Sequence, residues 1–362
     1  MLVSKSLEQN RSPSSPSGVF WGGPDRPSRC LRNLLEKRIH AVPPGGEILW
    51  VTYYFRDEAL AEALLQAKRR GVKVRVAIEG NPRTCAVNSR VLKLLGGNRG
   101  LGGGLRAIRH RLVDNRFFRI SRLHEKMYYF SHPVPSVMVG TFNPSGTQPE
   151  DPDIIRKIGD QDRGHNMLMN IVDPVLVEGF HEHALHLFNT LHGPWERYLS
   201  INNRLISSGK TRAIFFPRSK WADFYRLFEG LKRGNTLRMA VSHFNDRGIC
   251  KLLFALAQRG VHVEIIAHAT LRRVPSWVEE QMLRYKIIFH RYVHPEGLPM
   301  HNKFMLIDTS AHRIVTFGSM NLSVRSLHAN HELLVADENP EVYQAFRHRW
   351  EEMLMEMKDW QK

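Results

Sequence analysis

The pattern of apolar and polar residues in the first half of the chain predicts strands and helices in turn. Residues 47–55 (EILWVTYYF) form an apolar run of strand length. Residues 57–70 open with acids, space their Ala and Leu side chains as one face of a helix does, and end in Arg-Arg before a glycine. Residues 72–78 (VKVRVAI) alternate as a strand does. Strand, helix and strand with short connections predict a βαβ unit in a parallel or mixed sheet.

The same unit returns in the second half of the chain. Residues 241–268 align with residues 52–80, and Asp57 falls on Asp246 at a spacing of 189 residues. Later landmarks keep their order while the loops between them differ in length. Such internal similarity indicates two copies of one structural unit. We therefore expect two α/β domains, at residues 29–200 and 201–362, after a flexible Ser/Pro/Arg-rich arm at residues 1–28.

The second copy carries a compact group of polar residues at its strand ends. His301 and Lys303 begin an apolar run that ends at Asp308, and residues 318–321 (GSMN) end the next run. Residues two apart on a strand point to the same face, so one imidazole and one ammonium group should share a pocket. Small and amide residues at the end of the neighbouring strand suit a phosphate-sized ligand. The pattern predicts a phosphate site.

The first copy repeats this order with His124, Lys126 and Asn143. A twofold packing of the halves would place one phosphate between two imidazoles. One neutral imidazole could then attack phosphorus while the other, protonated, gives its proton to the leaving oxygen. The non-bridging oxygens would be held by Lys126, Lys303, Asn143, Asn321 and the hydroxyls of Thr141 and Ser319. Glu332 is the candidate carboxylate that would fix an imidazole tautomer.

The charge balance of the chain narrows the choice of ligand. The formal net charge is +17 and the pI is near 10.1, which predicts attraction to nucleic acid, an anionic membrane surface or a phosphorylated substrate. Residues 83–122 hold ten Lys and Arg residues against a single acid, Asp114. This segment is either a solvated surface or an electrostatic funnel that ends at Arg122, beside His124. We expect Arg122 to contact the substrate.

Other side chains add less to the picture. His243 ends the strand that matches the one ending at Tyr54, where it either lines the cleft or packs in the core. The two lysines supply the positive charge that phosphoryl chemistry needs, so we expect no metal and no cofactor. Three isolated cysteines (Cys30, Cys85 and Cys250) argue against a disulfide framework or a cysteine zinc site.

The chain also lacks an apolar run of about 18 residues and an apolar signal-like core near its start. We therefore expect a cytoplasmic protein that contacts anionic membranes peripherally through its basic surface.

The pattern HxKxxxxD followed by GSxN, found twice, resembles the phospholipase D superfamily. His301, Lys303, Asp308 and residues 318–321 match its motif in full. The resemblance implies two repeated α/β/α sandwich units with mixed sheets, packed as a pseudo-twofold pair. It also implies metal-independent phosphodiester cleavage or phosphatidyl transfer, with a site completed within one chain whatever its oligomeric state.

The first copy departs from the family motif at three positions. Ser131 stands at the aspartate position, Thr141 at the serine, and Asn166 where the second copy has Glu332. In family members with two motifs the first histidine is taken as the nucleophile, which here is His124. Because the first copy lacks supporting carboxylates, His301 is the alternative nucleophile.

Three functions are consistent with this pattern. Two motifs in one chain favour a phospholipase D or cardiolipin synthase-like enzyme that passes a phosphatidyl group to water or to another alcohol. The charge also permits a nuclease acting on DNA or RNA, whose binding should weaken steeply as salt rises. A non-catalytic polyanion-binding protein with a degenerate first motif would keep the charge but show no turnover.

Overall fold

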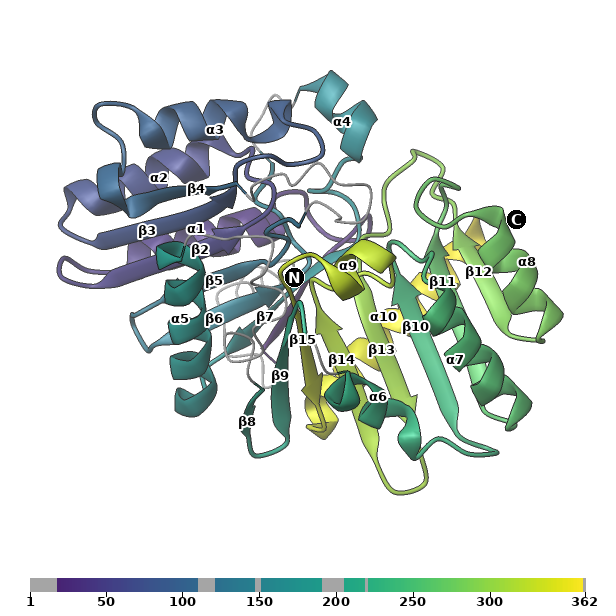
Figure 1. Ribbon diagram of the computed structural model, residues 1–362. Coiled ribbons are helices and arrows are strands. Elements are labelled where there is room, and N and C mark those ends of the chain that lie inside the picture. The colour runs from purple at the N-terminus through teal and green to yellow at the C-terminus, as the bar shows by residue number, and fades with distance from the viewer. Residues whose placement is uncertain (1–17, 110–120, 147–150, 191–204, 219–220, 361–362) are drawn as a thin grey trace, which may run out of the picture.

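The computed structural model describes residues 18–109, 121–146, 151–190, 205–218 and 221–360. Two mixed sheets dominate it, one from each half of the chain (Figure 1). The first has seven strands in the order β4-β3-β2-β5-β6-β7-β1. Its strands are β1 (Val19–Gly22), β2 (Glu47–Thr52), β3 (Lys73–Glu79), β4 (Leu105–Ile108), β5 (Met127–Phe130), β6 (Ser136–Gly140) and β7 (Asn166–Ile171).

The second sheet repeats this topology. Its order is β12-β11-β10-β13-β14-β15-β9-β8, so every strand of the first sheet has a counterpart and β8 is added at the edge. In both sheets the two βαβ pairs are parallel and the remaining pairs are antiparallel. The strands are β8 (Ile206–Ser208), β9 (Thr211–Phe216), β10 (Thr236–Val241), β11 (His262–His268), β12 (Ile288–Tyr292), β13 (Lys303–Asp308), β14 (Arg313–Gly318) and β15 (Glu332–Asp337). The predicted duplicated α/β fold is confirmed.

Helices cover both faces of each sheet. In the first half they are α1 (Cys30–Ala41), α2 (Glu58–Arg69), α3 (Ala86–Gly96), α4 (Pro152–Ile158) and α5 (Pro174–Asn189), with a short 3₁₀ turn at Gly102–Gly104. In the second half they are α6 (Ala222–Glu229), α7 (Arg247–Gln258), α8 (Ser276–Arg284), α9 (Val324–His328) and α10 (Pro340–Asp359). Among the described residues, none of these helices is long and apolar enough to cross a membrane.

One continuous core joins the two halves. Leu49 and Val51 of β2 pack in a cluster that also holds side chains of α5, α10 and the inner face of the second sheet. Ile48 and Trp50 point the other way, into the cluster under α1 and α2. Because both faces of β2 are buried, its sequence is continuously apolar instead of alternating. The halves therefore share an apolar interface, which holds the site between them rigidly.

The N-terminal segment corrects one expectation. Within the predicted arm of residues 1–28, Val19–Gly22 forms β1 and pairs with β7, and Asp25 forms an ion pair with Arg349 of α10 at 2.8 Å. The ring of Trp21 packs edge-on against Phe346, 4.9 Å away. A short apolar run, VFWG, was hidden by the Ser/Pro-rich residues around it. Residues 1–17 and the expected domain boundary at 200/201 lie outside the described residues.

Candidate active site

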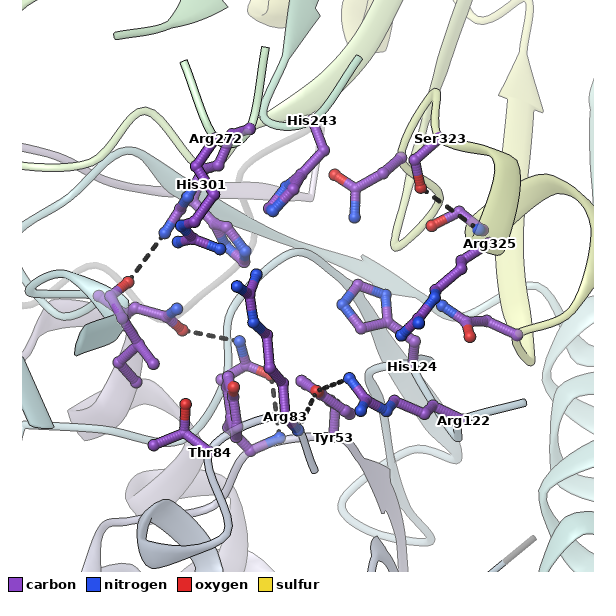
Figure 2. Close-up of a pocket in the computed structure, with 18 of the residues that line it drawn as sticks. Tyr53, Arg83, Thr84, Arg122, His124, His243, Arg272, His301, Ser323 and Arg325 are labelled. Carbon is purple, nitrogen blue, oxygen red and sulfur yellow. Dashed lines mark hydrogen bonds between the residues drawn. The ribbon is translucent and has the colours of Figure 1, made fainter. Parts of the chain in front are cut away.

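A cavity of about 360 Å³ opens between the two halves, and both copies of the motif contribute to its walls. Figure 2 shows His124 and His301 on different sides of this space, with His243 between them. Six cations line it: Arg83, Arg122, Lys157, Arg272, Arg273 and Arg325. No carboxylate occurs among the described lining residues, so the cavity should attract anions.

Each histidine is held by the backbone of the opposite half. The amide of His124 donates to the carbonyl of His331 at 2.9 Å, and the amide of His301 donates to the carbonyl of His165 at 3.0 Å. His124 and His301 precede β5 and β13, while His165 and His331 precede β7 and β15. These backbone hydrogen bonds join the two halves at the site and so constrain the distance between the two imidazoles.

The side-chain partners of the imidazoles are crossed in the same way. Nδ1 of His124 lies 2.8 Å from Oε2 of Glu332, and Nδ1 of His301 lies 2.8 Å from Oδ1 of Asn166. Glu332 therefore supports an imidazole, as expected, but the one from the other half. The expectation that His301 is the better-supported histidine is wrong, because the carboxylate of the second copy serves His124.

Two hydroxyls hold these partners in place. Ser319 Oγ donates to Glu332 Oε2 at 2.6 Å, and Thr141 Oγ1 donates to Asn166 Oδ1 at 3.1 Å. Asn166 Nδ2 donates to the carbonyl of Gln161 at 2.7 Å, which turns its Oδ1 toward His301. Each imidazole then carries its proton on Nδ1 and leaves Nε2 for the cavity. Thr141 and Ser319 were expected to contact the substrate, but the structure places them behind the imidazole partners.

The two lysines lie beneath the imidazoles. Lys126 Nζ donates to the carbonyl of His124 and Lys303 Nζ to that of His301, both at 2.7 Å. Burial lowers the pKa of Lys126 to about 7. Burial, with the neighbouring cations Lys126 and Arg273, lowers the pKa of Lys303 well below its usual value. An anion in the cavity would favour the charged form of both.

Burial also keeps the imidazoles neutral. It is the main cause that lowers the pKa of His124 to about 4, with Glu332 acting in the opposite direction. The pKa of His301 lies well below its usual value through burial and the nearby Lys303 and Arg273. A neutral imidazole has the free lone pair that a nucleophile needs.

The other residues predicted to contact the substrate all line the cavity. Asn143 and Asn321 line the cavity, and Asn143 Nδ2 donates to Gln161 Oε1 at 2.7 Å. His243 lines it as well, and its pKa is lowered well below the usual value by burial and by Arg273. Arg122 also reaches the cavity, where its Nη1 donates to the hydroxyl of Tyr53 at 3.3 Å.

Only part of the basic segment 83–122 faces the cavity. Arg83 and Arg122 line it, whereas Arg90, Lys93 and Arg99 lie along a separate surface groove that also contains Glu58 and Glu62. Residues 110–120 of this segment lie outside the described residues. The funnel interpretation therefore fits the two ends of the segment and not the groove residues.

Asp308 does not belong to the site. It ends β13 and pairs with Thr236 of β10, five residues from Lys303 and so roughly 17 Å along the strand. Its carboxylate contacts the Arg313 guanidinium at 3.4 Å and the Tyr343 hydroxyl at 3.4 Å. Ser131, its counterpart, accepts a hydrogen bond from the Glu47 amide at the same distant end. The missing first-copy aspartate therefore does not impair the cavity.

We expect Asp308→Asn to change kcat/KM for a small phosphodiester less than about threefold. The Arg313 partner is more than half exposed, and the amide oxygen of an asparagine still accepts from Tyr343, so the free energy of unfolding should fall by less than about 1 kcal/mol. Steady-state kinetics and urea denaturation of the purified variant check this. A loss of a hundredfold or more in turnover would return Asp308 to the catalytic group.

Sequence reasoning missed several residues that line the cavity. Arg272 and Arg273 follow β11, and Arg272 lies 189 residues after Arg83, which is the spacing of the repeat. Extending the alignment by a few residues past the second strand would have found this pair of positions. Gln161 and Arg325 also line the cavity, but no motif marks them.

Residues 45–148 and 228–354 match the model of a protein family described as "Cardiolipin synthase, PLD-like domain". The chain belongs to the phospholipase D superfamily. Each matched segment contains one cavity histidine and the lysine that donates to its carbonyl, so the family match and the duplicated fold agree. These findings support a phospholipase D-family phosphodiesterase in general terms.

Individual relatives are more distant. A mitochondrial cardiolipin hydrolase of Danio rerio is 27% identical over 133 residues, which cover 36% of this chain and 57% of that protein. The matched part is thus little more than half of the relative's length.

Two solved structures share the fold over 93% of this chain. They are the phosphatidylserine synthase of Haemophilus influenzae Rd KW20 (TM-score 0.66, 12% identity, 86% of that chain) and the polyphosphate kinase of Porphyromonas gingivalis (TM-score 0.60, 14% identity, 50% of that chain). At these identities the likeness concerns the fold alone.

Proposed function

We propose that this protein is a metal-independent phosphodiesterase that cleaves or transfers a phosphatidyl group through a phosphohistidine intermediate. The observation that carries the proposal is the pair of imidazoles, each with Nδ1 fixed from the other half and Nε2 left for one cationic cavity. A pair of opposed nitrogen atoms suits in-line displacement at phosphorus. The lipid substrate is favoured by the match to a cardiolipin synthase-like family and by the similarity to a cardiolipin hydrolase.

His124 is the nucleophile in this mechanism. When Nε2 of His124 bonds to phosphorus, the imidazole gains positive charge, and the Glu332 carboxylate at Nδ1 offsets it. The bond from phosphorus to the leaving oxygen breaks in the same step. His301, protonated while the anionic substrate is bound, gives its Nε2 proton to that oxygen.

The second step releases the product. Water or an alcohol loses a proton to Nε2 of His301 as its oxygen bonds to phosphorus, and the bond to His124 breaks. Asn166 suits this role because an amide oxygen holds the Nδ1 proton without adding a negative charge that would oppose proton release. Lys126 and Lys303 offset the charge on the non-bridging oxygens, and Asn143 and Asn321 offer neutral donors.

A nuclease is the second candidate, because the cation-lined cavity suits a strand with many phosphates. The non-catalytic alternative is less well supported, since the first motif keeps a complete set of partners around His124. Peripheral membrane docking through basic residues, at about 1 kcal/mol each, would bring a lipid substrate to the cavity.

One comparison tests the proposal. Purified protein in EDTA is incubated with phosphatidylglycerol vesicles and with single- and double-stranded DNA, alongside His124→Ala and His301→Ala. We expect turnover of the lipid by wild type only. Faster cleavage of DNA would favour the nuclease, and no turnover of either substrate would refute an enzyme of this type.

The pH dependence gives a further prediction. We expect kcat/KM for bis(p-nitrophenyl) phosphate to fall below about pH 4, where His124 gains a proton, and above about pH 7, where Lys126 loses its own. Lys126 sets the upper limit of the alkaline limb at about pH 7. Because the pKa of Lys303 is also lowered, loss of its proton would move this limb to lower pH.

Lys126→Met checks the origin of that limb. Removing one of two neighbouring cations raises the pKa of Lys303, so the alkaline limb should move to higher pH while the rate drops about a hundredfold. Initial rates across pH 3.5 to 9.5 measure both effects. An alkaline limb that stays in place would assign it to another group.

A further inference from the structure

Three arginines that line the cavity lie close to one another, and one of them, Arg273, lies near His301. Arg83 follows β3 and Arg272 follows β11 at the equivalent position of the other half, 189 residues later. Both line the cavity, and Figure 2 shows Arg83 pointing into it from the first half and Arg272 on the same side of the view as His301. Arg273 adds a third guanidinium, which is buried. The repeat therefore brings cations from two loops to one wall.

Within the described part of the chain, no carboxylate lines this wall. Among the described residues, the Arg83 and Arg272 guanidinium groups form no ion pair, whereas the buried guanidinium groups of Arg32 and Arg349 do pair with carboxylates. The groups to which Arg273 donates in the described part of the chain are neutral, the Ser242 hydroxyl at 3.4 Å and the Ile158 carbonyl at 2.9 Å.

The cations also repel one another. Burial lowers the pKa of Arg272, and Arg83 lowers it further. Burial, with Arg272 next, lowers the pKa of Arg273 to about 10. Cations held together without a carboxylate destabilise a fold, and a bound anion would offset that cost.

The phosphate at the imidazoles does not account for these arginines. A phosphodiester carries one negative charge, and once it is bound Lys126 and Lys303 in their charged forms more than balance it. The cavity volume of about 360 Å³ is in the range of sites for whole small molecules. A second anionic group of the same ligand fits the remaining charge and space.

The chemistry assigns this group to one end of the substrate. In-line attack by His124 places the leaving oxygen opposite it, beside His301, and Arg273 is close enough to lower the pKa of His301. Arg122 and Arg325 lie on the side of His124 in Figure 2. The arginine wall therefore faces the alcohol that departs or enters, and not the group that is transferred.

We propose that Arg83, Arg272 and Arg273 bind a second phosphate, carried by the alcohol that leaves during cleavage or enters during transfer. This inference rests on the proposed function in taking His124 as the nucleophile. With a lipid substrate, the alcohol is a glycerol-type alcohol bearing its own phosphate group. Two arginines from different halves could contact that phosphate from two directions, with bidentate geometry available to each.

A titration tests the second phosphate site without turnover. Calorimetry compares 1,3-propanediol bisphosphate with 1,3-propanediol monophosphate as ligands of wild type, Arg83→Gln/Arg272→Gln and Arg284→Gln. Arg284 ends α8 and is exposed outside the cavity, so it serves as the matched control. We expect wild type and the control to bind the bisphosphate at least about tenfold more tightly, and the double variant to lose this preference.

Because Arg83 and Arg272 are exposed and form no ion pair with any described residue, the double variant should melt no lower than wild type. Equal affinities in wild type, or a preference that survives in the double variant, would overturn the proposal.

Kinetics then test the side assignment. Cardiolipin, whose leaving alcohol carries a phosphate, is compared with phosphatidylglycerol, whose leaving glycerol does not, at equal mole fraction in phosphatidylcholine vesicles. We expect at least about a tenfold higher kcat/KM for cardiolipin in wild type and in Arg284→Gln, and a smaller ratio in Arg83→Gln/Arg272→Gln.

The other outcomes separate the two proposals. An unchanged ratio in the double variant, or an oligonucleotide cleaved in preference to both lipids, would overturn the inference in this form. Absence of turnover and of phosphohistidine would refute the proposed function, while the titration still decides the second phosphate site.

Discussion

His301→Ala is expected to form a phosphohistidine with an activated diester and then fail to hydrolyse it. With bis(p-nitrophenyl) phosphate the leaving group needs no proton, so His124 can still attack. Water then lacks the base that His301 supplies, and steady-state turnover should fall about 10³- to 10⁴-fold. Protein denatured at mildly alkaline pH, where the phosphorus–nitrogen bond survives, then digested and analysed by mass spectrometry, should carry the p-nitrophenyl phosphoryl group on His124.

His124→Ala provides the opposite result. It should form no covalent intermediate with the same substrate, and turnover should fall by at least about 10⁴-fold, as the loss of a nucleophile does in other hydrolases. Asp308→Asn serves as the control that keeps both steps. Phosphorylation found on His301 in the wild-type protein would reverse the assignment of the two histidines.

Glu332→Gln is expected to lower kcat about 10³-fold while leaving the backbone around His124 in place. The carboxylate fixes the Nδ1 proton of His124 and offsets the charge that forms on the ring, and an amide does neither as well. Its removal lowers the pKa of His124, because Glu332 favours the imidazolium form. The acid limb of the kcat/KM profile should therefore move to lower pH.

The matched variant is Asn166→Asp, which gives His301 the partner that His124 has. A second carboxylate should raise the pKa of His301, and we expect more than a tenth of the wild-type turnover to remain. If Glu332→Gln and Asn166→Asp lost activity equally, the carboxylate would matter only as a packing group.

Sequence reasoning found the fold and the two motifs because both depend on local patterns. Strand periodicity marked β2 and β3, and the repeat spacing marked their counterparts. It could not find which partner supports which histidine, because Asn166 reaches His301 from the other half of the chain. The spacing of residues along the sequence does not reveal a contact between the two halves.

Two further errors have local physical causes. The motif groups Asp308 with Lys303, but a strand of this length carries Asp308 to the far end of the sheet. Thr141 and Ser319 end strands at the cavity, yet their hydroxyls turn inward and bond to Asn166 and Glu332. A motif states which residues occur together and leaves open which of them meet the ligand.

The crossing of backbone and side chains between the halves constrains how this chain can evolve. A duplicated domain is usually free to lose function in one copy while the other keeps working. Here the histidine of each copy bonds to the other copy twice, through Nδ1 of its imidazole and through its backbone amide. A substitution in either copy alters the chemistry of the histidine in the other copy. Selection therefore acts on both copies together, and neither can lose its function independently.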